Sequence, residues 1–183
     1  MADDLLTNLS DVKLQLKLTT NVDDQLLSNL IKSGSDFVEG WINRKVMSAS
    51  YTTQMDGTGS AVMVLPNYPV TAVSSFKING TEIAQSAGWN SPGYLFDYWS
   101  IRLRSYTFVP GQLNCEVTYT AGYLSVPHDI EQACIDLICR KYRSLDRIGL
   151  TSKGLAGETT AYTQSDMSAD TKAMLNQYRR FTP

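Results

Sequence analysis

The sequence predicts an α+β protein with a helical bundle core, an inserted small antiparallel β subdomain and an extended C-terminal arm that ends in a helix. Apolar residues recur at three- and four-residue steps near 21–42 and 127–145, the spacing of one helix face. Short strand-like segments separated by Gly, Asn and Pro fill residues 50–121. We therefore predict a helical core over 1–148, interrupted at about 50–121, and an arm over 149–183.

Length, composition and charge exclude several classes of protein. The 183 residues suffice for one domain, and 43% hydrophobic with 19% charged residues argue against general disorder. The net charge of -2 predicts no nonspecific attraction of the whole protein to DNA. No apolar run approaches the ~20 residues that cross a bilayer, and the acidic start MADDLLTNLSD is unlike a secretory signal. We expect a protein made in the cytosol, without a membrane partner, that keeps its three cysteines reduced.

The first zone, 7–45, is predicted to hold two helices. Ser10 is expected to cap a short one, and a longer one begins near 21–24, where short polar side chains can accept from free backbone N–H groups. Gly34 falls within the apolar stripe of the longer helix, so it permits close contact with another helix. The stripe comprises Leu26, Leu27, Leu30, Ile31, Phe37, Val38, Trp41 and Ile42.

The second zone is predicted to be β-rich. Residues 56–60 are expected to form a turn between strands at 51–55 and 61–65. Asn79-Gly80 predicts a hairpin between 75–78 and 81–84. Apolar and polar residues alternate over 112–120, as in a strand with one wet face. Further strands are expected at 94–98 and 101–104.

A third helix is predicted from Pro127, a residue favoured at the first helical position, to about Leu145. Its apolar stripe comprises Ile130, Ala133, Cys134, Leu137, Ile138, Tyr142 and Leu145. Acidic residues lie early and basic residues late, which matches the helix dipole. A sharper hypothesis places the basic residues at a subunit interface or along a channel that DNA crosses: Arg140, Lys141, Arg143 and Arg147.

The last zone differs in composition. Residues 149–165 are rich in Gly, Ser and Thr with few large apolar side chains, so an extended or mobile segment is expected. Ser168 then predicts a helix N-cap, followed by one apolar face with Thr171, Met174, Leu175, Tyr178 and Phe181. A terminal helix on so long a connection suits gripping a neighbour better than building its own core. We interpret this zone as an assembly arm.

Catalytic, cofactor-binding and metal-binding residues are not predicted. The single histidine, His128, is expected to be a helix-entry residue near solvent. Cys134 and Cys139 fit helix packing better than a Cys–His pair. Asp97 and Glu116 could form a glycosidase-type pair, although their positions in the β zone give little support for it. The sequence therefore favours a protein that is not an enzyme.

The order of motifs from the β zone onward resembles one family. The run from Val117 through Thr120-Ala-Gly-Tyr123 to Val126-Pro127, and the helix pattern Ile130–Ala133 and Leu137–Tyr142-Arg143, is similar to the HK97-like head-tail connector (adaptor) family of tailed bacteriophages. The segments 65–76, 147–162 and 178–181 are similar to those of its longer, β-inserted members. Residues 85–110 depart from the family pattern, so the role of the inserted sheet stays open.

The resemblance implies a structural function in the virion neck. Family members form a ring of twelve copies beneath the portal protein, extend the DNA channel, and dock the next stopper or tail protein. The resemblance also implies that the C-terminal arm engages the portal, where buried aromatic and aliphatic anchors carry most binding energy. The candidate portal-binding residues are Leu150, Lys153, Leu155, Tyr162, Met174, Leu175, Tyr178, Arg179, Arg180 and Phe181.

An alternative from another class is a carbohydrate-binding or carbohydrate-active module on the β zone. Tyr94, Phe96, Tyr98 and Trp99 could form a sugar-stacking platform, although such clusters more often pack a core. A sugar-binding module has no need of the long arm and its terminal helix.

Overall fold

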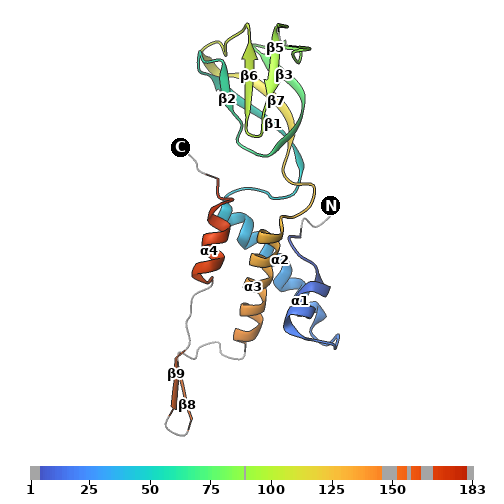
Figure 1. The fold of residues 1–183 in the computed structure, drawn as a ribbon, viewed down its shortest axis with the longest axis vertical. Helices are drawn as coiled ribbons and strands as arrows, with labels where there is room; N and C mark the ends of the chain where they lie inside the picture. The colour runs from blue at the N-terminus through green and yellow to red at the C-terminus, as the bar shows by residue number, and fades with distance from the viewer. Residues whose placement is uncertain (1–4, 89, 146–151, 156–157, 162–166, 181–183) are drawn as a thin grey trace. The chain divides into compact units, whose positions relative to one another are not determined.

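The computed structural model describes residues 5–88, 90–145, 152–155, 158–161 and 167–180. The chain divides into two compact units, one of Met1–Arg44 with Val126–Pro183 and one of Lys45–Ser125. We call them the helical unit and the β unit (Figure 1). The α+β class is confirmed, since the described residues hold helices and antiparallel sheets.

The helical unit contains α1 (Leu9–Leu16), α2 (Asp24–Ile42), α3 (His128–Ser144) and α4 (Ala169–Asn176). α1 and α4 both pack against the α2–α3 pair, and Figure 1 shows α4 beside α2 and α3. The two short strands β8 (Ser152–Leu155) and β9 (Glu158–Ala161) pair antiparallel. The backbones of 152–155 and 158–161 are thus not merely extended, as expected, but paired as two strands.

Local signals fix the helix ends. The cap of α1 is Asn8 rather than the predicted Ser10: its Oδ1 accepts from the Asp11 N–H at 3.0 Å and from the Ser10 hydroxyl at 2.6 Å. The predicted start of α2 within 21–24 is confirmed by its first residue, Asp24. Pro127 is the N-cap of α3 rather than its first residue, so the helix begins one residue later than predicted, at His128.

The contact between α2 and α3 is the core of the helical unit. Buried side chains of α2 (Leu27, Ile31, Val38 and Ile42) belong to the same core as those of α3 (Ile130, Ala133, Leu137 and Ile138). A Cβ placed on Gly34 would lie 2.9 Å from Cγ1 of Ile138. The predicted close contact at Gly34 is therefore confirmed. The buried part of the stripe is narrower than predicted, because Leu26 is exposed and Leu30 half-buried.

The β unit consists of two antiparallel sheets. One has the strand order β1-β7-β3-β4, with β1 at Ala49–Gly57, β3 at Val70–Ile78, β4 at Thr81–Glu82 and β7 at Gly111–Ala121. The other has the order β2-β6-β5, with β2 at Val62–Val64, β5 at Gly93–Phe96 and β6 at Ser100–Arg104. The predicted hairpin at Asn79-Gly80 is confirmed, with both residues at positive φ. β1 and β2 lie in different sheets, so the predicted turn at 56–60 does not join a paired hairpin.

The core of the β unit draws on both sheets. Cys115, Val117 and Tyr119 of β7 are fully buried, while the intervening residues carry polar groups, so the predicted wet face is confirmed. Phe76 packs edge-on against Tyr94 and Phe108, at ring-centre distances of 5.6 and 5.7 Å. Aromatic packing of this kind adds roughly 0.5–1.5 kcal/mol beyond burial.

Replacing Gly34 tests the helix contact. Gly34→Leu is expected to destabilise the helical unit by about 1–3 kcal/mol, because the new side chain must displace Ile138. Gly40→Leu is the matched control, since nothing lies within 4 Å of its Cβ position. There the gain in helix propensity should raise stability by up to about 1 kcal/mol. Thermal unfolding followed by circular dichroism measures both; equal effects of the two substitutions would contradict the close contact.

Candidate interaction surfaces

The terminal helix α4 is docked on the chain's own helical unit. The predicted N-cap is confirmed: the Ser168 hydroxyl accepts from the Thr171 N–H at 3.1 Å. Met167, Thr171 and Leu175 are buried, Leu175 completely. The apolar face that the sequence predicted is therefore used within the chain.

The residues after α4 strengthen this docking. The Tyr178 hydroxyl donates to Oδ2 of Asp129 at 3.3 Å, and the Arg180 N–H donates to the Ile42 carbonyl at 2.8 Å. Trp41 of α2 has two cations over its ring, with Lys172 Nζ at 5.9 Å and the Arg179 guanidinium at 5.8 Å from its centre. Each such cation–π contact contributes roughly 0.5–1 kcal/mol at an exposed site. α4 is thus fixed by contacts along its length.

This placement changes the interpretation of the candidate arm. The expectation that the terminal helix stays apart from the chain's own core is wrong, because its apolar face meets α2 and α3. Met174 and Tyr178 are half-buried and Arg179 is exposed. Lys153 and Leu155 lie on β8, of which only the backbone is described. Leu150, Tyr162 and Phe181 fall outside the described residues.

The basic end of α3 is only partly available to a partner. Lys141 places its Nζ 5.1 Å from the centre of the Phe37 ring, so its charge is engaged within the helical unit. Arg140 and Arg143 are exposed, three positions apart on one helix face. Arg147 lies outside the described residues.

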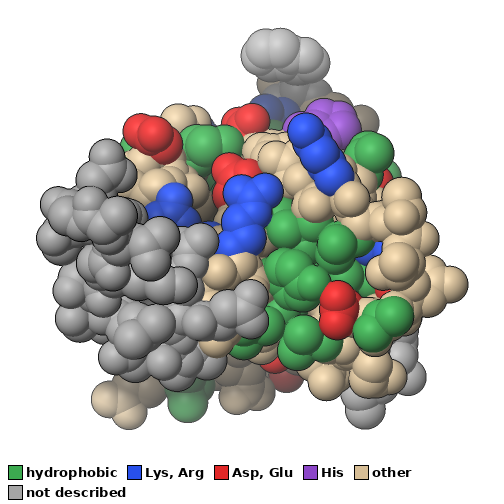
Figure 2. Space-filling view, turned by 90° about the horizontal axis from the view of Figure 1, so that it is seen from below, with side chains coloured by type: hydrophobic (Ala, Val, Ile, Leu, Met, Phe, Trp, Pro, Cys, Tyr) green, Lys and Arg blue, Asp and Glu red, His purple; other side chains and the backbone are tan. Residues whose placement is uncertain are grey.

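Exposed apolar surface is a second feature. One face of the molecule carries a continuous area of hydrophobic side chains with Lys or Arg side chains at its border (Figure 2). In the helical unit, Leu14 and Val22 are 79% and 87% exposed. Leu14 also lines a shallow hollow, together with Leu9, Ser10, Lys13 and Leu18. Contiguous exposed apolar surface of this kind often marks a protein-binding site.

The residues weighed for catalysis have structural surroundings. His128 begins α3 with a fully exposed side chain, which confirms the predicted helix-entry position. Cys134 is buried, and this burial raises the pKa of its thiol to about 12, so it is a poor nucleophile. Cys115 and Cys139 are also buried and free, and burial raises their pKa values too. Among the described residues no cluster of His, Cys, Asp and Glu could hold a metal ion.

Asp97 and Glu116 accept hydrogen bonds from their neighbours within the β unit. Burial opposes the charge of Asp97, but hydrogen bonds from the Trp99 and Ser100 N–H groups and the Ser100 hydroxyl, with the Arg102 charge, lower its pKa overall. Hydrogen bonds from Lys77 and Gln54 lower the pKa of Glu116. An acid for glycoside hydrolysis needs a raised pKa, so neither carboxyl suits that role.

The aromatic residues proposed as a sugar platform are divided. Tyr94 is buried in the core and Phe96 packs against it. Tyr98 and Trp99 are exposed, and Tyr98 bonds instead to the Tyr123 hydroxyl at 3.1 Å. The Tyr68 ring also packs against the Tyr98 ring in a tilted arrangement, a contact that the sequence did not predict. This arrangement gives no single aromatic face for a sugar ring.

The chain is similar to proteins of known family. The sequence model of one protein family, described as "Head completion protein", matches residues 5–181. The chain belongs to the head completion protein family. The predicted kinship with phage head-tail connectors is thereby confirmed. No curated protein matches the chain.

Solved structures share the fold over most of the chain. One described as "Neck of empty GTA particle computed with C6 symmetry" is 20% identical, covers 96% of this chain and 90% of its own, and gives a TM-score of 0.59. "Neck of native GTA particle computed with C12 symmetry" is 17% identical, with 86% and 84% coverage and a TM-score of 0.53. "Virion of native gene transfer agent (GTA) particle" is 16% identical, with 96% and 90% coverage and a TM-score of 0.58. At such identity the likeness shows a common fold. Within the described ranges no helix combines the length and apolarity needed to span a bilayer.

Substitution of Leu175 tests whether α4 belongs to the core. Leu175→Ala is expected to destabilise the protein by about 2–4 kcal/mol, because it leaves a cavity between α4 and the helices beneath. Met174→Ala, at the neighbouring half-buried position, should cost about 1 kcal/mol or less. Chemical denaturation gives both values. A negligible effect of Leu175→Ala would mean that α4 is undocked in solution.

The role of Asp97 predicts a pH dependence. Asp97→Asn is expected to cost about 1 kcal/mol at neutral pH, a modest value because the side chain is 38% exposed and solvent screens its charge. Because the folded pKa is lowered, the advantage of the native residue is fully present above the unfolded value and is lost as pH falls through the folded one. The stability difference should therefore shrink below about pH 4. Thermal unfolding from pH 7 downward measures it, and a difference that grows on acidification would contradict the assignment.

Proposed function

We propose that this chain is a non-enzymatic head-to-tail connector that forms a ring below the portal, extends the DNA channel and docks the next neck or tail protein. The family match over residues 5–181 carries the proposal. The shared fold with neck chains solved under six- and twelve-fold symmetry supports a closed ring, with twelve copies as the number. A ring requires a heterologous interface, in which each copy uses two different surfaces.

The portal contact is assigned to the connection between α3 and α4. Both ends of this connection are anchored, since α3 lies in the core and α4 is held by Leu175 and by the Trp41, Asp129 and Ile42 contacts. An element tethered at both ends loses less conformational entropy on binding than a free tail. The portal-contacting residues are therefore proposed among Leu150, Lys153, Leu155 and Tyr162 rather than at Leu175.

Arg140 and Arg143 are proposed for contacts between copies or for the wall of the DNA channel. Both are exposed on α3, and neither forms an ion pair with another described residue. DNA must pass without being held, and few cations attract phosphates only weakly at physiological salt. An overall charge of -2 agrees with nonspecific passage rather than binding.

An arm-replacement variant tests the portal contact. Residues 150–162 are replaced by a Gly/Ser sequence of equal length, which leaves α4 and its anchors in place. We expect unchanged thermal stability and loss of co-sedimentation with tail-less heads that carry the portal. Simple deletion of 150–183 is less informative, because it also removes buried Leu175.

The matched control is Asp36→Ser, at an exposed position of α2 that has no proposed contact; it leaves the connection intact and should keep head binding. Wild-type head binding by the arm-replacement variant would contradict the assignment of the arm. Failure of the wild-type protein itself to bind heads would contradict the proposed function.

A further inference from the structure

Leu113 has a backbone conformation and an exposure that the fold of the β unit does not explain. The register of β1 and β7 passes from Met55–Cys115 to Gly57–Gly111, so 112–114 bulge opposite a single residue, Asp56. Leu113 lies in this bulge at φ 47, the left-handed region that an L side chain with no special hydrogen bond avoids. Its side chain is 62% exposed. Neither backbone preference nor burial therefore favours leucine here.

The bulge is held firmly by hydrogen bonds. Asp56 Oδ1 accepts from the Leu113 N–H at 2.6 Å. The Asn114 amide accepts from the Gly57 N–H and donates to the Val109 carbonyl, both at 2.8 Å. The Asn114 carbonyl accepts from the Asn79 N–H at 2.8 Å. A bulge re-aims a side chain, and strain that the surroundings enforce points to a functional position.

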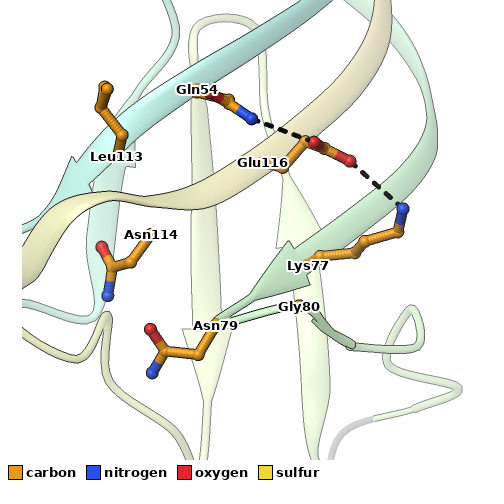
Figure 3. Close-up of a pocket in the computed structure, with 7 residues that line it drawn as sticks. All are labelled: Gln54, Lys77, Asn79, Gly80, Leu113, Asn114 and Glu116. Carbon is orange, nitrogen blue, oxygen red and sulfur yellow. Dashed lines mark hydrogen bonds and ion pairs between the residues drawn. The ribbon is translucent and has the colours of Figure 1, made fainter.

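Leu113 lines a polar hollow, and the connection that leads into β7 carries further exposed apolar groups. Tyr106 and Val109, in the connection from β6 to β7, are each 46% exposed. The hollow is lined by Gln54, Lys77, Asn79, Gly80, Leu113, Asn114 and Glu116. Figure 3 shows Gln54, Glu116 and Lys77 joined in a row, with Leu113 set apart from it. We call Tyr106, Val109, Leu113 and this hollow the β tip.

The charged residues around the β tip indicate which class of partner it fits. Around the β tip, Asp56, Glu82 and Glu116 outnumber the single ammonium group of Lys77, which bonds to Glu116 at 3.2 Å and faces Glu82 in the strand register. Surplus carboxylates repel a phosphate backbone, so DNA is disfavoured. A second copy of this chain is also disfavoured as the partner. The apolar hollow that it would offer is bordered by Lys13, whose ammonium group is already paired with Asp24 at 2.7 Å. A protein with an apolar depression bordered by Lys or Arg is complementary in shape and charge.

We propose that the β tip docks such a protein, the neck or tail component that joins next to this chain, with Leu113 as the central apolar contact. This inference rests on the proposed function, which assigns the portal contact to the α3–α4 connection. A pre-formed, strained leucine inserts into a partner without further ordering of the backbone, which favours binding.

Leu113→Gly separates binding from folding, because it removes the side chain and relieves the left-handed backbone at once. The thermal midpoint should rise by roughly a few degrees. Binding to tail-less heads should stay at the wild-type level, while joining of purified tails to those heads should fall at least about tenfold. Tail joining is measured as infectious particles formed after mixing heads, this protein and tails.

Ser105→Gly is the matched control, because Ser105 also has a positive φ, 65, in the connection from β6 to β7 and carries no apolar side chain. It should raise the thermal midpoint and leave joining unchanged. Leu113→Asn, which tolerates the left-handed region, should reproduce the joining defect without loss of stability. The two Leu113 variants together exclude a defect that comes from a damaged fold.

Unchanged tail joining by either Leu113 variant would overturn the proposal. Loss of head binding would assign the β tip to the portal, and loss of self-association of the purified protein would assign it to a second copy; both results overturn the stated partner. Each of these outcomes differs from failure of the wild-type protein to bind heads, which concerns the proposed function alone.

Discussion

The close approach of α2 and α3 at Gly34 is the constraint on which the helical unit depends. With no Cβ at this position, Ile138 packs directly against the α2 backbone, at a distance that a side chain would block. Leu27, Ile31, Val38 and Ile42 can then share one core with α3. α1 and α4 are short helices of eight residues each, a length that is marginal in isolation, so both rely on this pair for their stability. Glycine lowers intrinsic helix propensity here, and the packing that it permits offsets the loss.

Docking of α4 determines which surfaces remain for partners. Because Leu175 and the cations on Trp41 hold the end of the chain, the connection from α3 to α4 is constrained at both ends, unlike a free tail. In the β unit, the side chains of Gln54, Glu116 and Lys77 form a hydrogen-bonded row on the polar outer face. The bulge of β7 holds Leu113 in a strained, left-handed backbone conformation. The proposed connector binds two unlike neighbours and its own copies, and surfaces on separate units would allow these contacts to form independently.

Much of the fold could be predicted from local signals. Asn79-Gly80 predicts its hairpin because both positions need positive φ, and Ser168 predicts its helix because a hydroxyl caps a free N–H. Three features escaped prediction for a common reason, which is that they depend on tertiary partners. The turn residues at 56–60 do not indicate that β1 and β2 belong to different sheets. The alternation along β7 does not predict the bulge at Leu113. The apolar face with Leu175 does not indicate whether it packs within the chain or against a partner. The connector family was recognisable from the order of motifs, whereas its contact residues stay proposals, because partner surfaces leave no periodic pattern.

Electron cryomicroscopy of intact particles can show whether copies of this chain form a closed structure at the neck, as proposed. The two units are fitted separately into density at the junction of head and tail. We expect a ring of copies around the DNA channel, with the α3–α4 connection against the portal and the β tip against the next component. Neck density that cannot accommodate either unit would contradict it.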